Sequence, residues 1–380
     1  SLYILDVTNS ASLFATILVV SKIPMILLSM IGGIAADRLP RKSIMVVLDF
    51  FTSLCILCFT LSMHRFDIVF LTGCLMVILS IIQAFYQPSV SASIPSITAK
   101  DNLTSANSVT TGINAIASLA APALGGMLYG FFGIDQILWL SMICFFLSAI
   151  LELFLTIPFT KQKSSQRLLP MLINDFKEAM HFVTKRQPIM LQLAMTLIGL
   201  NFLVSALIAV GLPYIITIQL NLSSQLYGFM ESALAIGMMI GAFMAMKLKD
   251  RITIRNCYIP MGIGILSMSL IGVAILTFDY PIHSYIIILF AVLFGMSAIS
   301  IFNIVSQAYI QGRTPSELLG KVTSFIMTIT QCALPLGQAM FGILFDHFSA
   351  YSAWIVFAAT VLSLWITAYI KKTLLRIPRE

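Results

Sequence analysis

The chain has 380 residues, of which 59% are hydrophobic and only 10% charged, and its net charge is +7. Soluble domains carry about a quarter charged residues, so this composition excludes an ordinary soluble protein. The basic excess does not indicate nucleic-acid binding, because the basic residues lie in short loops between long apolar runs. We therefore expect an all-α integral membrane protein whose surroundings are the lipid bilayer.

Apolar runs long enough to cross a bilayer, which takes about 20 residues, follow one another along the whole chain. Before the first run stands a stub, 1–7, which ends at the turn Thr8-Asn9-Ser10 and is too short to cross. We interpret the stub as the end of a truncated first span, which predicts twelve spans in all. The eleven full runs are 11–36, 43–63, 68–94, 104–132, 136–157, 189–218, 225–247, 256–278, 283–310, 319–345 and 351–370.

The lysines and arginines predict which side of the membrane each loop faces. If the loop after the run 11–36 is cytoplasmic, the 22 basic residues all face the cytoplasm except Arg65, in an outer loop, and Lys22, inside a run. Basic residues gather on the cytoplasmic side of membrane proteins, so this asymmetry supports the predicted number and order of the spans. The prediction places both termini in the cytoplasm.

One connection, 158–188, is much longer than the others and is basic. Its stretch from Leu168 to Val183 has apolar residues near helical spacing, so we interpret it as an interfacial helix. It would join two six-helix bundles, 1–157 and 189–380. Two landmarks recur in both halves at one spacing, Asp37-Arg38 with Asp250-Arg251 and Pro122 with Pro335. Parallel six-span repeats are a plan of secondary transporters.

Several motifs resemble those of the major facilitator superfamily. The loop Gly33-x-x-x-Asp37-Arg38-x-x-Arg41-Lys42 resembles the superfamily's signature loop between the second and third spans, with Pro40 where a glycine is usual. Two stretches resemble its bacterial exporter branch, which includes macrolide-efflux and enterobactin-exporter proteins: Phe85-Tyr86-Gln87-Pro88 through Leu103-x-x-Ala106-Asn107-Ser108, and its C-terminal counterpart Gln307 through Val322. Ala117-x-x-x-Ala121-Pro122-x-x-Gly125-Gly126 resembles the fifth-span motif of drug antiporters, with alanines in place of two glycines.

The resemblance implies the major facilitator fold, two six-helix bundles that move by alternating access. It implies export of amphipathic small molecules, such as drugs, macrolides or siderophores, across a bacterial plasma membrane by proton antiport. No cofactor or metal is expected, and the protein is expected to be a monomer. Asp37 would lock the two halves together in one conformation, with Asp250-Arg251 as a weaker counterpart. Antiporters of this kind often carry an arginine in the fourth span, and the run 68–87 has none. Proton coupling would then lie elsewhere or be absent.

Three charged residues inside apolar runs are candidates for function. A lysine at the centre of a span costs about 2.5–3.5 kcal/mol, so Lys22 should face protein or a watery cavity unless it snorkels to the interface. Glu231 is a candidate proton carrier or a partner of Lys22, and Gly237-x-x-x-Gly241 after it predicts close helix packing. Glu152 lies near the end of its run, where we expect it to reach water easily. Asp6 precedes the outer turn and is interpreted as a cap.

Neutral polar residues on the fourth, fifth, seventh and tenth spans are further candidates for substrate contact, against the alternative that they only form hydrogen bonds between helices. Such bonds are worth about 0.6 kcal/mol on average in membranes. In the family that the motifs resemble, the first, fourth, seventh and tenth spans line the central cavity. The candidates are Gln83, Gln87, Asn114, Asn201, Asn303 and Gln307.

Two other classes of protein fit the sequence less well than a transporter does. A membrane-embedded enzyme would need paired acids or a His/Glu metal cluster within spans, and the sequence suggests neither. A non-transporting sensor or scaffold on the same fold is opposed by the intact Asp37-Arg38 loop. Direct use of ATP is not expected, because the chain has no Gly-x-x-x-x-Gly-Lys-Ser/Thr loop.

Overall fold

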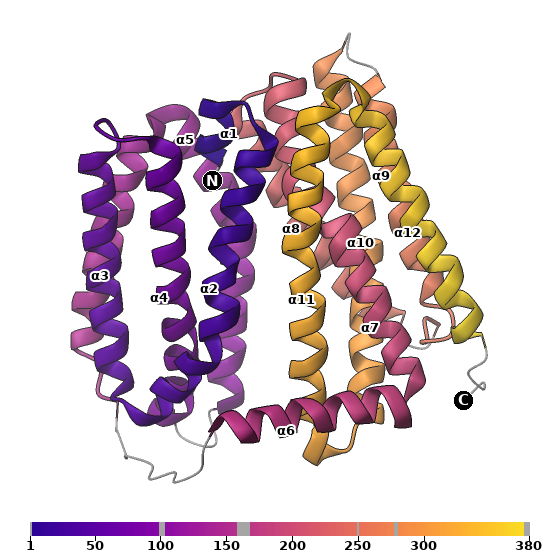
Figure 1. Cartoon of the computed structure of the whole chain (residues 1–380), viewed down its shortest axis with the longest axis horizontal. Coiled ribbons are helices and arrows are strands. Elements are labelled where there is room, and N and C mark those ends of the chain that lie inside the picture. Colours follow the sequence, from indigo (N-terminus) through magenta and orange to yellow (C-terminus); the bar gives the residue numbers. More distant parts are fainter. Residues whose placement is uncertain (1, 99–102, 158–167, 249–250, 277–279, 376–380) are drawn as a thin grey trace. The chain divides into compact units, whose positions relative to one another are not determined.

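The computed structural model describes residues 2–98, 103–157, 168–248, 251–276 and 280–375, which are almost entirely helical and include no strand. Ten helices in these ranges are long and apolar enough to cross a membrane. The chain divides into two compact units, Ser1–Ser165 and Gln166–Glu380 (Figure 1). The predicted all-α membrane architecture is thus confirmed. The boundaries 1–157, 158–188 and 189–380 and the count of twelve spans stay predictions.

The first unit begins with a short helix that ends at the predicted turn. Asn9, with φ 50°, adopts the left-handed conformation that ends the helix, and the Ser10 hydroxyl accepts a hydrogen bond from the Leu13 N–H (3.2 Å). Ser10 therefore caps the next helix in the usual way. The helices of this unit are α1 (Leu2–Thr8), α2 (Ala11–Arg38), α3 (Arg41–Ser62), α4 (Ile68–Ile97) and α5 (Leu103–Leu153).

α5 contains two of the predicted runs, 104–132 and 136–157. They meet at Gly133, whose φ of 77° and ψ of −179° are not helical, so the chain kinks there. Glycine tolerates this conformation because it has no Cβ. The predicted break between the two runs is confirmed, although the connection is a kink and not a loop.

The second unit contains the remaining helices. The predicted run 189–218 is a helix that widens into π-helical turns after Leu200, a local irregularity that often marks functional sites. The elements are α6 (Leu168–His181), η2 (Phe182–Arg186), α7 (Pro188–Leu200), η3 (Asn201–Ser205), η4 (Leu207–Gly211), η5 (Tyr214–Gln219), α8 (Ser224–Lys247), α9 (Tyr258–Leu276), α10 (Pro281–Arg313), α11 (Ser316–His347), η6 (Ser349–Tyr351) and α12 (Ser352–Leu374).

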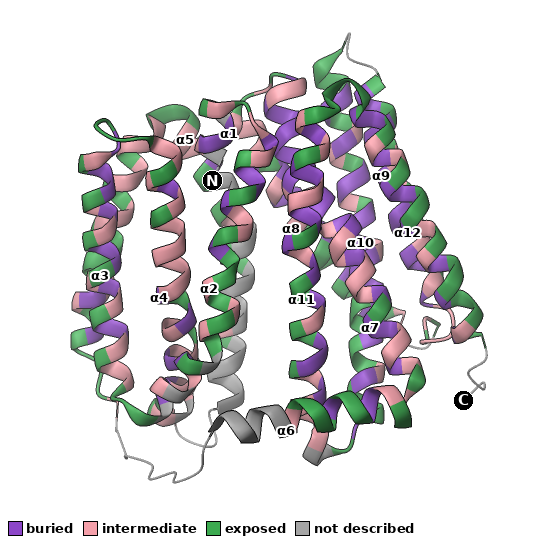
Figure 2. Ribbon diagram, in the orientation of Figure 1, coloured by how far each residue is buried: buried purple, intermediate pink, exposed green. Residues whose placement is uncertain are grey.

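Corresponding helices pack in the same pairs in each unit. In the first unit α2 packs on α4, and α3 on α5; in the second, α8 packs on α10, and α9 on α12. Buried residues follow one another at helical spacing, and on α3 they include polar side chains such as Asp49 and Thr52 (Figure 2). The repeat seen in the sequence is therefore also a repeat of helix packing.

The predicted close approach at Gly237 and Gly241 is confirmed on α8. A Cβ added to Gly237 would lie 2.6 Å from the carbonyl oxygen of Leu293 on α10, and one added to Gly241 would overlap the carbonyl oxygen of Ser297. Small residues at this spacing let two helix backbones touch, which is how helices associate in membranes.

α6 covers most of the stretch predicted as an interfacial helix and packs on α11. Lys321 of α11 forms ion pairs with Asp175 (2.8 Å) and Glu178 (2.7 Å) of α6. The rings of Phe176 and Phe325 meet edge-on with centroids 4.7 Å apart. One lysine and one aromatic pair thus hold the linker helix on the second unit.

We expect Lys321→Glu to loosen α6, because it replaces two attractions with two repulsions. The charge reversal acts on two acids at once, so amide exchange in α6 should accelerate about tenfold. Hydrogen–deuterium exchange with mass spectrometry measures this. Lys177→Glu makes the same charge change on α6 itself, at a lysine with no recorded ion pair to the described residues, and should leave the exchange rate nearly unchanged. Equal rates in the two variants would contradict the role of Lys321.

Candidate functional site

The signature loop lies between α2 and α3, and its basic residues bind helix ends of the first unit. Arg41 donates from Nε to the Ala36 carbonyl (2.9 Å) and from Nη1 to the Ala92 carbonyl (2.6 Å) and the Ser96 hydroxyl (2.7 Å). Lys42 donates to the Leu153 carbonyl (2.7 Å). A cation suits these positions, because helix C-termini carry partial negative charge. The loop therefore joins the ends of α2, α4 and α5.

The other residues of the gating motif are less engaged. Arg38 is exposed in the last turn of α2, and a Cβ on Gly33 would meet no described atom within 4 Å. The side chain of Asp37 and all of Asp250 lie outside the described residues. Arg251 is exposed, and its carbonyl accepts a hydrogen bond from the Asn256 amide (2.7 Å). The proposed lock between the two halves stays a prediction.

The two charged candidates inside spans differ in their surroundings. Lys22 has an exposed side chain on α2, and no ion pair to it is recorded among the described residues. Glu231 is half-buried on α8, and the hydroxyl of Tyr227, one turn earlier, donates to its Oε1 (2.5 Å). Glu231 is therefore held in place within its own helix. Its pairing with Lys22 stays a prediction.

The neutral polar candidates are mostly accessible within their own unit. Gln83, Gln87, Asn303 and Gln307 are exposed. Asn201 is half-buried at the start of η3, where its amide donates to the Leu197 carbonyl (3.1 Å). This is a local bond within one helix, not the bond between helices given as the alternative role.

Four further candidates lie on the stretch of α5 before the kink. The side chain of Asn114 lies outside the described residues, and so does that of Pro122, which belongs to the antiporter-like motif. Gly125 is exposed, with no described atom within 4 Å of an added Cβ, whereas Gly126 is buried. The described part of this motif therefore offers small, partly accessible positions.

A buried polar cluster in the first unit escaped the sequence analysis. Asp49 of α3 is 3% exposed, and Glu152 of α5 is 7% exposed. The Tyr86 hydroxyl donates to Glu152 Oε1 (2.9 Å). The expectation that Glu152 reaches water easily is therefore wrong, since α4 covers its side chain. Asp49 was the available signal, as the single acid inside the run 43–63.

A cavity of about 350 Å³ adjoins this cluster. Asp49, Tyr86 and the candidate Gln83 line it, together with Thr52 and Ser148. Two polar side chains of α4, Gln83 and Tyr86, thus line the same cavity as the buried carboxylate of Asp49.

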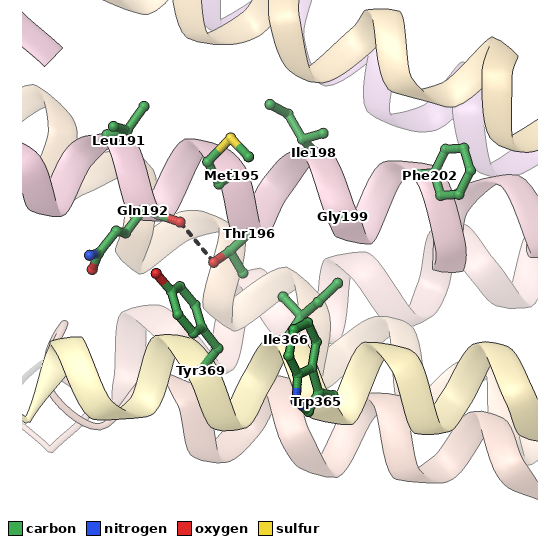
Figure 3. Close-up of a pocket in the computed structure, with 10 residues that line it drawn as sticks. All are labelled: Leu191, Gln192, Met195, Thr196, Ile198, Gly199, Phe202, Trp365, Ile366 and Tyr369. Atoms are coloured by element: carbon green, nitrogen blue, oxygen red, sulfur yellow. Dashed lines mark hydrogen bonds between the residues drawn. The ribbon is translucent and has the colours of Figure 1, made fainter. Parts of the chain in front are cut away.

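An apolar pocket of about 570 Å³ lies between α7 and α12 in the second unit. Gln192 and Thr196 lie on the side of α7 that faces α12, and Tyr369 and Ile366 reach back toward α7 (Figure 3). Thr196 donates to the Gln192 carbonyl (2.8 Å), while the side-chain Oε1 of Gln192 is buried without a hydrogen-bond partner. Apolar walls with one free acceptor suit an apolar molecule that carries a hydroxyl or amine.

Gly199 opens this pocket where α7 meets α12. A Cβ on Gly199 would lie 2.6 Å from the Cδ1 atom of Ile366, so the glycine leaves room for that side chain. Met195 and Phe202 complete the wall.

The comparisons with known proteins agree over nearly the whole chain. The model of the transmembrane secretion effector family matches residues 1–379. The chain is 23% identical to the uncharacterized MFS-type transporter YfiS of Bacillus subtilis, covering 92% of this chain and 82% of that protein. It is 22% identical to macrolide efflux protein A of Streptococcus pyogenes, covering 95% and 87%.

Its fold is similar to that of a bacterial homologue of the iron transporter ferroportin, with a TM-score of 0.68 at 18% identity, covering 97% of this chain and 93% of that one. At this identity the likeness concerns the fold alone. The helical repeat, the signature loop and these matches all lead to one family. The chain therefore belongs to the transmembrane secretion effector family of the major facilitator superfamily, and it is a multi-pass membrane transporter, not an enzyme.

Proposed function

We propose that this transporter exports amphipathic small molecules by proton antiport. The observation that carries the proposal is the similarity to macrolide efflux protein A over 95% of the chain. The pocket between α7 and α12 supports it, because apolar walls beside the free Gln192 acceptor suit such molecules. The transporter works as a monomer in the bacterial plasma membrane, with both termini cytoplasmic, and moves its two bundles by alternating access.

The test is transport by the purified protein in liposomes, with erythromycin as a macrolide probe and an acidic lumen. We expect erythromycin to accumulate as protons leave, and a protonophore to abolish the accumulation. Absence of any proton-driven or exchange flux, across macrolides and cationic dyes, would contradict export and favour the non-transporting sensor or scaffold. Flux that ignores the proton gradient would remove the antiport alone.

Glu231→Gln should weaken proton-driven accumulation strongly, because the variant keeps the shape and the Tyr227 hydrogen bond but loses the titratable group. Removing an essential acid–base group typically costs about 100-fold or more in rate, and we expect a loss of that order. The measurement is the initial rate of erythromycin uptake under the imposed gradient.

Lys22→Ala should reduce the same rate if Lys22 is the charge partner of Glu231 during the cycle. Asp135→Asn serves as the matched control, since Asp135 is a half-buried acid that lies 3.4 Å from His64 and is not a coupling candidate. Wild-type rates in both Glu231→Gln and Lys22→Ala would exclude them as the coupling pair.

A further inference from the structure

The buried carboxylates of the first unit form one cluster across three helices. Asp49 comes from α3, Tyr86 from α4, and Ser148 and Glu152 from the part of α5 beyond Gly133. Tyr86 donates to Glu152, and Ser148 lines one cavity with Asp49 and Tyr86. Both carboxylates are more than nine-tenths buried. The cluster therefore places two buried acids beside Tyr86 in an otherwise apolar helix interface.

No described cation neutralises these two acids. On α3, Lys42 is bound to the Leu153 carbonyl and Arg41 to carbonyls of α2 and α4. On α2, which packs against α4, the side chains of Lys22 and Arg38 are exposed. Among the described residues, neither Asp49 nor Glu152 has a recorded ion pair.

Two other titratable groups of these helices do not neutralise the buried acids either. The Cys144 thiol lines the cavity, and Asp135 pairs with His64 near the Gly133 end of α5. Within the described part of the unit, the two buried acids both adjoin Tyr86, which donates to Glu152 and lines one cavity with Asp49.

Two negative charges in such a place are unfavourable. Burial removes the water that stabilises a carboxylate, and a second carboxylate nearby adds repulsion. The Oε2 atom of Glu152 is buried and accepts no hydrogen bond from the described residues, so the protein itself leaves one oxygen of the pair unsatisfied. A proton bound to the pair removes one charge and supplies the missing partner.

The cavity gives that proton a route to water. Asp49 and Tyr86 line it, and the Tyr86 hydroxyl contacts Glu152, so a proton can pass between the cavity and Glu152 through the tyrosine hydroxyl. A bound metal ion is a poorer fit, because the described residues contain no group of three or more His, Cys, Asp or Glu side chains able to hold one.

We propose that Asp49 and Glu152, linked by Tyr86 and Ser148, form a proton-binding site that takes up and releases one proton in each transport cycle. The proton adds to a carboxylate oxygen of the pair and leaves to water in the adjoining cavity, so no other reactant is needed. This inference rests on the proposed antiport and assigns its coupling to the first unit, apart from the candidate Glu231.

The decisive measurement separates coupling from substrate movement. In liposomes, Glu152→Gln and Asp49→Asn should lose gradient-driven erythromycin accumulation down to the protein-free level, while exchange of erythromycin without a gradient continues. Tyr86→Phe should reduce the driven rate and keep the exchange. Asp135→Asn should behave as wild type in both assays. Driven accumulation that survives in both acid variants overturns the proposal, whereas absence of driven accumulation in the wild type contradicts only the antiport.

A second measurement needs no substrate and no variant. Dicyclohexylcarbodiimide takes the proton of a buried carboxylic acid, the carboxylate adds to its central carbon, and rearrangement leaves a stable N-acylurea. Peptide mass spectrometry of the wild-type protein should find this adduct on Glu152 or Asp49, in an amount that falls as the pH rises. An absent or pH-independent adduct overturns the proposal. Protection by sodium chloride at constant pH also overturns it, in favour of a sodium site.

Discussion

Replacing Gly241 with alanine should lower the apparent melting temperature of the protein by about 5–10 °C, since overpacking against a backbone costs about 3 kcal/mol. A methyl group there would overlap the Ser297 carbonyl oxygen and lie 2.8 Å from the Ser300 Cβ. A carbonyl within a helix cannot move aside as a flexible side chain can, so α8 and α10 would have to separate along their contact. Fluorescence-detected chromatography after heating in detergent measures the change.

The matched control is Gly73→Ala on α4, where an added Cβ meets no described atom within 4 Å. Alanine is favoured over glycine inside a helix by about 1 kcal/mol, so this variant should melt at or slightly above the wild-type temperature. The two substitutions are chemically identical, and opposite signs are expected because only one of them lies at a helix contact. Equal melting temperatures would mean that α8 and α10 are not in close contact.

Replacing Arg41 with alanine should destabilise the first unit by about 3 kcal/mol, because it removes charge-assisted hydrogen bonds that are each worth about 1.5–3 kcal/mol. Three acceptors lose their donor, namely the carbonyls of Ala36 and Ala92 and the hydroxyl of Ser96. We expect both the melting temperature and the transport rate to fall. Arg41→Lys should recover little, since an ammonium group cannot reproduce the fork that reaches two helices at once.

Arg38→Ala distinguishes support of the fold from gating within the same loop. Arg38 is exposed at the end of α2 and makes no recorded hydrogen bond or ion pair with the described residues, so its loss should leave the melting temperature unchanged. If the loop also gates the transporter, the transport rate of this variant should still fall. A melting temperature lowered as much as in Arg41→Ala would contradict the separate roles of the two arginines.

Much of the fold was predictable, because the bilayer imposes simple lengths and every span must satisfy its own backbone. The run 68–94 became α4 (Ile68–Ile97), and the run 225–247 became α8 (Ser224–Lys247). Gly237 and Gly241 were correctly interpreted as a packing motif. The kink at Gly133 and the π-helical turns after Leu200 were not foreseen, because apolar periodicity alone does not distinguish them from a loop or a regular helix.

The site was predicted less well, because a polar residue in an apolar run does not reveal its neighbours. The roles of Glu231 and Gln83 stay predictions, and Glu152, which was expected to reach water, is instead buried and bonded to Tyr86. Asp49 drew no attention, since its importance depends on α4 and α5, whose contributing residues are far away in the sequence.

The sequence by itself determined that the protein is helical, lies in a membrane and consists of two repeated halves, because these properties depend on the length, spacing and sidedness of local segments. Only the tertiary structure decided which polar residues meet. It brought Asp49 and Tyr86 to one cavity with Glu152 bonded to Tyr86, placed Arg41 between the ends of α2 and α4, and formed an apolar pocket between α7 and α12. The physical reason is that burial and hydrogen bonding depend on contacts between helices, and no local pattern in the chain records those contacts.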